Sequence, residues 1–353
     1  MKRLGTEKAQ LYYEANARAV QRYRTLARQF PCDMEDMTAY VYSANNKQKL
    51  EHEAAAYSVL GINTRFQDNP PLPFKTTGAL GMEGQAQFHP LKLLYALAND
   101  LDIYENTFVN KIKGHVAITS KGRIRANNIV LATHYPFINV PGLYFMKLYQ
   151  HRSYVIALEN APKLDGMYVD HREYGHSFRT YDNQLFVGGG DHKTGKRGGS
   201  YAKLRKLAKQ AYPHATEKYH LATQDCMTLD KIPYIGRHRT GTENLFVATG
   251  FNKWGMTGAM VAAELLTDLI VTGQSDLAEL YNPGRSMLSR QLFINIGSAA
   301  KGLLSFGGPR CTHMGCKLRW NAVEKSWDCT CHGSRFDDKG HVINNPAKKG
   351  KRL

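Results

Sequence analysis

The sequence predicts a mixed fold, α/β plus α+β, and three observations lead to this prediction. A strand, a glycine loop and the start of a helix follow one another over 244–257, which is typical of an α/β unit. Residues 149–191 are rich in strand patterns, as in an antiparallel sheet. Residues 303–353 contain two short loops in which Cys alternates with His, which indicates a separate small site.

The remaining elements follow from the spacing of apolar residues. A long amphipathic helix is expected over 7–30, because Leu11, Ala15, Ala19, Tyr23 and Leu26 recur at helical intervals. Pro90 is expected to begin a helix, at the position that proline favours. Further helices are expected over 47–60, 201–212 and from Thr257 onward. Strands are expected over 37–43, 107–112, 116–119, 123–126, 128–132, 218–227 and 244–249.

Charge and length limit the classes of function. The 353 residues suffice for two or three domains, and the formal net charge is +17. The basic residues are dispersed except for the run Lys348–Arg352, and no nucleic-acid-binding motif accompanies them, so nucleic acid is not an expected partner. From Leu303 onward Lys and Arg exceed Asp and Glu by six. This excess favours docking of an acidic electron carrier of the ferredoxin or flavodoxin type, with a solvated basic surface as the alternative.

The sequence gives no sign of a membrane segment. The longest apolar helical run, Gly258–Val271, is interrupted by Glu264 and Asp268 and is too short to span a bilayer. The N-terminus lacks the apolar core of a signal peptide, so a cytoplasmic location is expected. Six cysteines in a chain of this length do not make a disulfide scaffold, and we interpret Cys32 and Cys226 as buried or incidental thiols.

The most specific motif is the pair of Cys/His loops. Cys311 and His313 form a C-x-H motif, and Cys329 and His332 form a C-x-x-H motif after fifteen intervening residues. Two thiolates and two imidazoles are the ligands of a Rieske two-iron two-sulfur (2Fe-2S) cluster, in which the thiolates bind one iron and the imidazoles the other. The alternative is a structural zinc site, although zinc ribbons usually have two C-x-x-C pairs.

These loops resemble the Rieske family through Cys311-Thr312-His313-Met314-Gly315-Cys316 and through the sequence HGSRFD that begins at His332. The resemblance implies a disulfide between Cys316 and Cys331, and a hydrogen bond from the Ser334 hydroxyl to a bridging sulfide. Two positions depart from the family pattern. Thr330 replaces a usual proline, and Phe336 replaces a tyrosine of high-potential members, so an intermediate reduction potential is expected.

A second motif lies over 245–257, where an apolar strand runs into a glycine loop and a helix N-terminus. Such a terminus has unpaired N–H groups and a partial positive charge, which suit an anion or an electron-rich ring edge. Together with Asp230–Gly236 and Ile129–His134, this unit resembles the flavin-dependent amine and amino-acid oxidase family typified by D-amino-acid oxidase and glycine oxidase. The whole chain resembles bacterial oxidoreductases in which such a flavoprotein is fused to a C-terminal Rieske domain.

The resemblance implies both the architecture and the FAD contacts. A partial FAD-binding Rossmann-like domain with an antiparallel-sheet substrate domain would precede a small, abbreviated all-β Rieske domain. The expected bounds are 1–283 for the flavoprotein, with substrate-domain parts at about 30–80 and 145–228, then a linker at 284–302 and the Rieske domain at 303–353. Val109 would contact the adenine, and Ala132 and Thr133 the ADP half of FAD. Residues near the isoalloxazine would be Gly250, Phe251, Gly255, Met256 and Thr257.

Two features are missing relative to these families. No G-x-G-x-x-G motif for the FAD pyrophosphate occurs in the chain, so we expect the chain to begin inside the flavin domain. Only residues 286–310 lie between the last flavoprotein helices and Cys311, whereas Rieske domains place several strands there. We therefore expect little of the sheet that normally supports the ligand loops.

The resulting hypothesis is an oxidoreductase in which a small-molecule substrate reduces FAD, and electrons then pass singly through the cluster to a carrier. An amine, amino acid or hydroxy compound is the substrate that the resemblance implies, and the sequence permits either direction of electron flow. The catalytic residues are unknown, with His89, His134, His151 and Tyr154 as candidates for the base. The alternatives are an electron-transfer protein that has lost FAD binding and a truncated, non-functional remnant.

Overall fold

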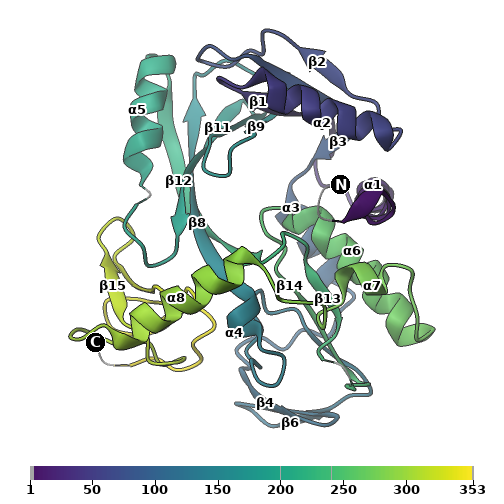
Figure 1. Cartoon of the computed structure of the whole chain (residues 1–353), viewed down its shortest axis with the longest axis vertical. Coiled ribbons are helices and arrows are strands. Elements are labelled where there is room, and N and C mark those ends of the chain that lie inside the picture. The colour runs from purple at the N-terminus through teal and green to yellow at the C-terminus, as the bar shows by residue number, and fades with distance from the viewer. Residues whose placement is uncertain (1–3, 199, 240, 352–353) are drawn as a thin grey trace. The chain divides into compact units, whose positions relative to one another are not determined.

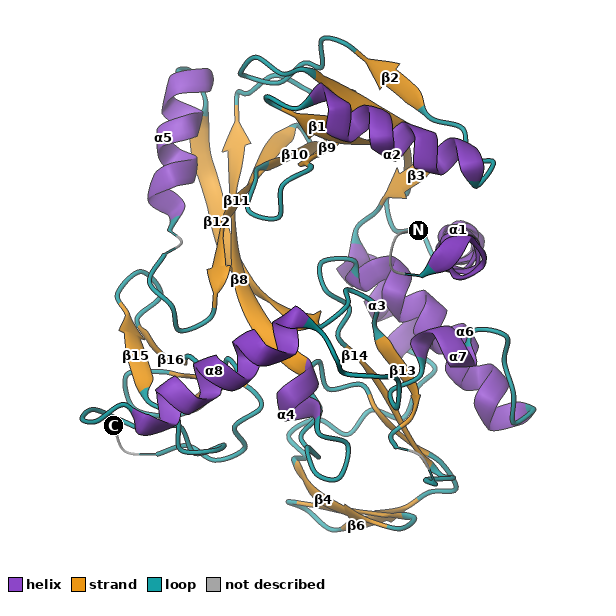
Figure 2. Cartoon of the chain, viewed as in Figure 1, coloured by secondary structure: helices purple, strands orange, loops and turns teal. Residues whose placement is uncertain are grey.

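The computed structural model describes residues 4–198, 200–239 and 241–351, which divide into two compact units. The first unit contains Met1–Leu101, Arg152–His192 and Gly198–Thr223. The second contains Asp102–His151, Lys193–Arg197 and Gln224–Leu353. Figure 1 labels the elements along the chain, and Figure 2 separates the helices from the strands.

The elements have the following bounds. The helices are α1 (Gly5–Gln29), α2 (Lys47–Val59), α3 (Pro90–Ala98), α4 (Tyr144–Lys147), α5 (Tyr201–Ala211), α6 (Gly255–Val271), α7 (Ala278–Tyr281) and α8 (Arg290–Leu304). The strands of the first half are β1 (Glu35–Ser43), β2 (Arg65–Gln67), β3 (Gly78–Gln87), β4 (Val109–Lys113), β5 (Val116–Thr119), β6 (Arg123–Arg125), β7 (Ile129–Leu131), β8 (Leu148–Glu159) and β9 (Gly166–Asp170). Those of the second half are β10 (Ser177–Tyr181), β11 (Gln184–Lys193), β12 (Thr216–Thr228), β13 (Tyr234–Arg237), β14 (Leu245–Thr249), β15 (Leu318–Asn321), β16 (Ser326–Cys329), β17 (Arg335–Phe336) and β18 (Val342–Asn344).

The first unit is organised around an eight-stranded sheet with the order β12-β8-β11-β10-β9-β1-β3-β2. β1 pairs antiparallel with β3 and parallel with β9, and α2 packs against β1 and β3. The ring of Tyr40 stacks on that of Tyr168 with their centroids 4.7 Å apart. Gly81 and Gly166 flank the Tyr40 ring, and a Cβ atom at either position would lie 2.5–2.6 Å from it. The buried ring on β1 therefore requires one glycine on each of the two strands that flank it, β3 and β9.

The second unit contains the strand–loop–helix motif. β14 pairs antiparallel with β13 and parallel with β7, and α6 packs against β13 and β14. Its core joins Leu131, Tyr144 and Val247, which are at most 3% exposed, with Ile112 of the separate antiparallel sheet β4-β5-β6 packed against them. β8 and β12 also contribute to this unit, through residues 148–151 and 224–228.

The C-terminal part of this unit is a four-stranded antiparallel sheet with the order β15-β16-β17-β18, preceded by α8. A buried ion-pair network replaces part of a hydrophobic core there. Arg335 on β17 is 5% exposed, and it pairs with Asp328 and with Glu324 at 2.9 Å each. It also donates a hydrogen bond to Ser326, so both acids and the guanidinium are satisfied.

Most expected elements lie within two residues of their predicted ends, including α1, α2, α5 and β14. β3 was missed because its sequence, GALGMEGQAQ, has three glycines and no strong alternation. The segment expected to be a linker is largely helix α8. Cys32 and Cys226 are free and buried, as predicted. Within the described ranges, no helix combines the length and apolar character needed to cross a membrane.

We expect Leu265→Ala to destabilise the chain by about 2–5 kcal/mol, because Leu265 on α6 is fully buried and its truncation leaves a cavity. Val271 at the end of the same helix is 75% exposed, so Val271→Ala is the matched control and should change stability by no more than about 0.5 kcal/mol. Urea unfolding followed by tryptophan fluorescence measures both. Equal effects of the two substitutions would contradict the packing of α6.

Candidate electron-transfer site

The two Cys/His loops have the same local structure. In the first loop the N–H of Cys311 donates to the carbonyl of Cys316 at 2.8 Å, and in the second the N–H of Cys329 donates to that of Ser334 at 2.8 Å. Each turn contains a glycine with positive φ, Gly315 at +74° and Gly333 at +81°. These conformations favour glycine, so the loops require it there.

The structure brings the four predicted ligands together. The rings of His313 and His332 are perpendicular, with their centroids 5.0 Å apart, and the thiols of Cys311 and Cys329 are hydrogen-bonded to each other. Cys316 and Cys331 form a disulfide that joins the two loops. Helix α8 lies against this bridge, where a Cβ atom at Gly302 would be 2.5 Å from the Cys331 sulfur.

Burial and the contact between the two thiols set the protonation states of these side chains. The hydrogen bond from Cys329, together with one from Ser334, lowers the pKa of Cys311, whereas the pKa of Cys329 is raised by its bond to Cys311 and by burial. Burial lowers the pKa of His313 to about 4 and that of His332 to about 3. Both imidazoles are therefore neutral at pH 7, and the Nδ1 atom of each is buried without a hydrogen-bond partner.

Two buried glutamines hold the second loop. The Gln150 side chain on β8 donates to the carbonyls of His332 at 2.8 Å and Asn345 at 3.0 Å. The Gln224 side chain on β12 donates to the carbonyl of Gly333 at 2.9 Å and to the Gln150 side chain. The expectation that the ligand loops have little support is therefore wrong, because β8 and β12, which lie outside the small sheet, supply that support.

The loop after β11 completes this support. Thr194 donates its N–H to the Gln150 carbonyl at 2.9 Å. Gly195 lies so close to the second ligand loop that a Cβ atom there would be 2.6 Å from the Thr330 nitrogen and 2.7 Å from the Cys329 carbonyl carbon. This close approach requires glycine, which also has a positive φ of +76°.

The first loop contacts the segment after β7. The Nδ2 atom of Asn139 lies 3.0 Å from the Nε2 atom of His313, and the ring of Tyr135 meets the His313 ring edge-on at 6.5 Å. The Asn345 side chain donates to the carbonyls of Thr133 at 2.6 Å and Tyr135 at 2.9 Å. Segment 132–139 thus connects the predicted FAD turn to a predicted iron ligand within one compact unit.

The predicted FAD residues fall into two groups, apart from Val109. The turn Ala132–Thr133 and Gly250 lie at the same edge of the sheet, because β7 and β14 are parallel, and the Thr249 hydroxyl donates to the His134 carbonyl at 2.5 Å. Ala132 and Thr133 are exposed. Gly250 has a φ of +71°, and a Cβ atom there would be 2.3 Å from the Thr228 side chain.

The second group surrounds the start of α6. Trp254 is the N-cap residue of this helix, and its side chain makes no capping hydrogen bond; Gly255, Met256 and Thr257 form the first turn. Phe251 packs against Gly258, which holds the loop on the helix. Val109 lies elsewhere, on β4 of the separate three-stranded sheet.

The candidate bases are divided between the two units. His89 and Tyr154 belong to the first unit, where His89 caps α3 and Tyr154 stacks against His192 in the core. His134 and His151 belong to the second, and burial lowers the pKa of His134. None of these four side chains is distinguished as a catalytic base.

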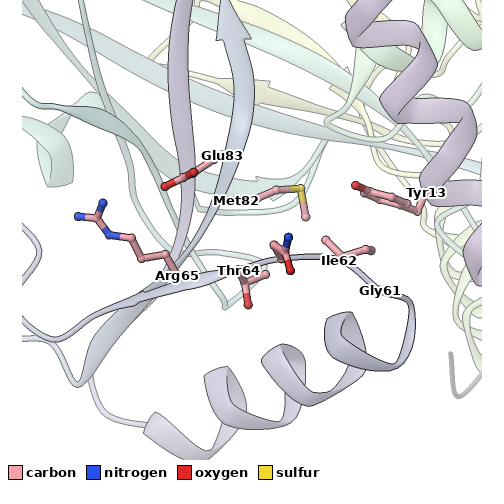
Figure 3. A pocket seen from close by; sticks show the side chains of 8 residues that line it. Tyr13, Gly61, Ile62, Thr64, Arg65, Met82 and Glu83 are labelled. Carbon is pink, nitrogen blue, oxygen red and sulfur yellow. The ribbon is translucent and has the colours of Figure 1, made fainter.

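Figure 3 shows a pocket of about 420 Å³ in the first unit. Tyr13 of α1, the segment 61–65, and Met82 and Glu83 of β3 line it. The side chains of Arg65 and Glu83 are at one side of the pocket and Tyr13 is at the other. None of the predicted site residues lines this pocket.

The supporting residues Asn139, Gln150 and Gln224 were missed from the sequence. None of them belongs to a spacing motif, so no pattern connects them to the cysteines. The available signal was the polar stretch Gln150–Ser153 inside an otherwise apolar strand, which is unusual for a buried β-strand.

Comparisons with known proteins agree with this geometry. The family model for FAD dependent oxidoreductases matches residues 3–269, and the Rieske [2Fe-2S] domain model matches residues 269–352. The putative Rieske 2Fe-2S iron-sulfur protein YhfW of Bacillus subtilis is 33% identical over an alignment 414 positions long, which covers 99% of this chain and 81% of that protein. Iron-sulfur subunit 1 of the Nostoc cytochrome b6-f complex is 51% identical over 39 residues, 11% of this chain and 22% of the subunit.

Solved structures show the same fold for the larger part. Glycine oxidase from Geobacillus kaustophilus superposes with a TM-score of 0.67 at 19% identity, covering 78% of this chain and 82% of that one. L-proline dehydrogenase from P. horikoshii superposes with a TM-score of 0.62 at 14% identity, covering 76% and 81%. The chain belongs to the FAD-dependent oxidoreductase family and has a Rieske [2Fe-2S] domain at its C-terminal end.

Proposed function

We propose that this oxidoreductase couples oxidation of a small amine, amino acid or hydroxy compound at FAD to one-electron transfer through a 2Fe-2S cluster held by Cys311, His313, Cys329 and His332. The proposal rests on the position of segment 132–139. This segment begins at the predicted FAD turn and ends at Asn139, whose side chain contacts the imidazole of His313. Two redox centres bound at its ends would share one short stretch of chain.

The described residues fit a Rieske cluster. His313 and His332 are neutral and have unpaired Nδ1 atoms, which is the form that binds iron. With Nδ1 on iron, Nε2 of His313 carries the proton and needs an acceptor. Asn139 can present its side-chain oxygen there, since that oxygen is buried without a partner and an amide can be turned over. The disulfide also withdraws Cys316 and Cys331 from any four-cysteine zinc site.

The described residues also fit the part of FAD near the ring. The N-terminus of α6, which the Trp254 side chain does not cap, has a partial positive charge, and Gly250 lies at the same sheet edge as the exposed turn Ala132–Thr133. When bound, FAD accepts a hydride from a C–H group next to nitrogen or oxygen, and the cluster carries single electrons. The residues of α6 and of the turn would orient the cofactor.

For the electron carrier we propose an acidic partner of the ferredoxin or flavodoxin type. The chain has an excess of six basic residues from Leu303 onward, although Arg352 lies outside the described residues. Lys348 and Lys349 follow the small sheet, and the Thr312 hydroxyl of the first ligand loop donates to the Lys349 carbonyl at 2.6 Å. Positive charge is thereby held beside the proposed cluster, where it would attract an acidic surface.

The coupling is tested by anaerobic reduction of the intact chain with glycine, L-proline and glycerol 3-phosphate as substrate probes. We expect one probe to bleach the flavin absorbance and then to produce the rhombic EPR signal of a reduced Rieske cluster. A cluster without flavin would support the electron-transfer alternative. A colourless protein that contains zinc would contradict the proposal.

We expect His313→Ala and His332→Ala to abolish the cluster EPR signal, because each removes one of the two imidazole ligands. The control is His341→Ala, since His341 is an exposed histidine in the loop between β17 and β18 and pairs with Asp337 at 2.9 Å. Iron content and EPR after dithionite reduction should be unchanged in the control. Loss of iron in all three variants would indicate unfolding and would contradict the ligand assignment.

Acid should destabilise the metal-free chain. The folded-state pKa values of His313 and His332, about 4 and about 3, lie below the unfolded value near 6.5, so the unfolded state binds more protons in between. Their contribution is complete above pH 6.5 and is lost as the pH falls toward 4. Between pH 7 and pH 5 we expect each to reduce the free energy of unfolding by roughly 2 kcal/mol.

Urea unfolding of the metal-free chain and of its His332→Gln variant at both pH values measures this effect. Glutamine does not titrate, so the variant should lose roughly 2 kcal/mol less than the parent over the same interval. An equal loss in both proteins would show that His332 is not buried in its neutral form.

A further inference from the structure

Lys193 ends strand β11 in the second unit, and its ammonium group is buried. The Nζ atom has no hydrogen-bond partner among the described residues, although it lies over the ring of Tyr149 at 5.8 Å from the centroid. Burial, followed by repulsion from Lys196, lowers the pKa of Lys193 to about 8. The amine is therefore protonated in most molecules at neutral pH, although water does not reach it to stabilise the charge.

This ammonium lies near the second of the two loops proposed to hold the cluster. Lys193 interacts electrostatically with Cys329 and with His332, the two predicted ligands of that loop. The two residues that follow it fix the segment there, because Thr194 bonds to Gln150 and Gly195 contacts the backbone of the second ligand loop. The position of Lys193 therefore depends on the same buried contacts as the position of His332.

A buried, unpaired ammonium is unfavourable unless a negative charge appears near it. In an oxidised Rieske centre two ferric irons are balanced by two sulfides and two thiolates, so the centre is neutral, and gain of one electron makes it singly negative. Only the reduced state would give Lys193 a countercharge. The low polarity around the loops strengthens that interaction relative to water.

We propose that Lys193 is a positioning residue of the electron-transfer site that stabilises the one-electron-reduced cluster and thereby raises its reduction potential. This inference rests on the proposed function, because it requires the cluster to be present. It assigns a role in the chemistry to a residue outside the small C-terminal sheet and outside both ligand loops. It also offsets the loss of the tyrosine hydroxyl that Phe336 replaces.

The test is an EPR-monitored redox titration of the intact chain and of Lys193→Met, which retains the length of the side chain without its charge. At the ambient potential that half-reduces the parent cluster, we expect the ratio of reduced to oxidised cluster to fall about tenfold in the variant, which corresponds to about 59 mV for a one-electron couple. Lys193→Arg should restore most of the ratio, because it restores the positive charge.

The matched control is Lys196→Met, which removes an exposed lysine of the same loop. Water screens its charge, so the ratio should change less than twofold. In the metal-free chain, Lys193→Met should also raise the melting temperature, because it removes a buried charge without a partner. This readout does not depend on activity or on the cluster.

The outcomes separate the two proposals. A parent chain without a reducible cluster would overturn both the proposed function and this inference. If the parent chain has a reducible cluster, two results would overturn only the inference. One is a ratio of reduced to oxidised cluster that is the same in Lys193→Met as in the parent, and the other is an equal change of this ratio in Lys196→Met. If Lys193→Met lost its cluster, Lys193→Gln would be titrated instead, and an unchanged ratio there would likewise overturn the role of Lys193.

Discussion

The rest of the site depends on the hydrogen bonds that Gln150 and Gln224 make to the second ligand loop. Carbonyl groups of His332 and Gly333 are buried, so each needs a donor, and the two side-chain amides provide them. The amides also bond to each other, which leaves each of them one orientation. Because Gln150 accepts the N–H of Thr194 at its carbonyl, the same contacts place the Lys193 segment. Removal of either glutamine would leave buried groups unpaired on both sides.

This arrangement explains how so small a sheet can hold two ligand loops. The strands β15–β18 are short, and the Arg335 network and the disulfide between the loops supplement their small hydrophobic core. Further support comes from residues that the FAD-dependent oxidoreductase model covers, namely Asn139, Gln150 and Gln224. The ligand loops are therefore built into the second compact unit rather than attached to it by a flexible tether. The proposed electron transfer would benefit, because Asn139 of the segment that begins at the predicted FAD turn contacts His313.

The sequence predicted what depends on local spacing and missed what depends on tertiary contact. Cys311, His313, Cys329 and His332 could be identified because thiolates and imidazoles at fixed intervals have few other uses. Strand β14 and helix α6 could be predicted from a change in apolar periodicity at Gly250. The support for the ligand loops could not be predicted, since Gln150 and Gln224 are 74 residues apart and precede the carbonyls that they bind in the second loop by 182 and 109 residues. The sequence does not show to which carbonyl group a polar side chain in a strand will donate a hydrogen bond.

The charges of the site favour reversible one-electron transfer. Its histidines are neutral because burial makes their protonation unfavourable, and the shared proton of Cys311 and Cys329 is released when a metal binds. With both thiolates bound, the proposed oxidised centre would be neutral as a whole, and the buried cation at Lys193 would have a countercharge only after reduction. A site that stabilised both oxidation states equally would not need an unpaired ammonium. Because the buried ammonium of Lys193 would stabilise only the reduced state, it would raise the reduction potential. It does not determine the direction of electron flow.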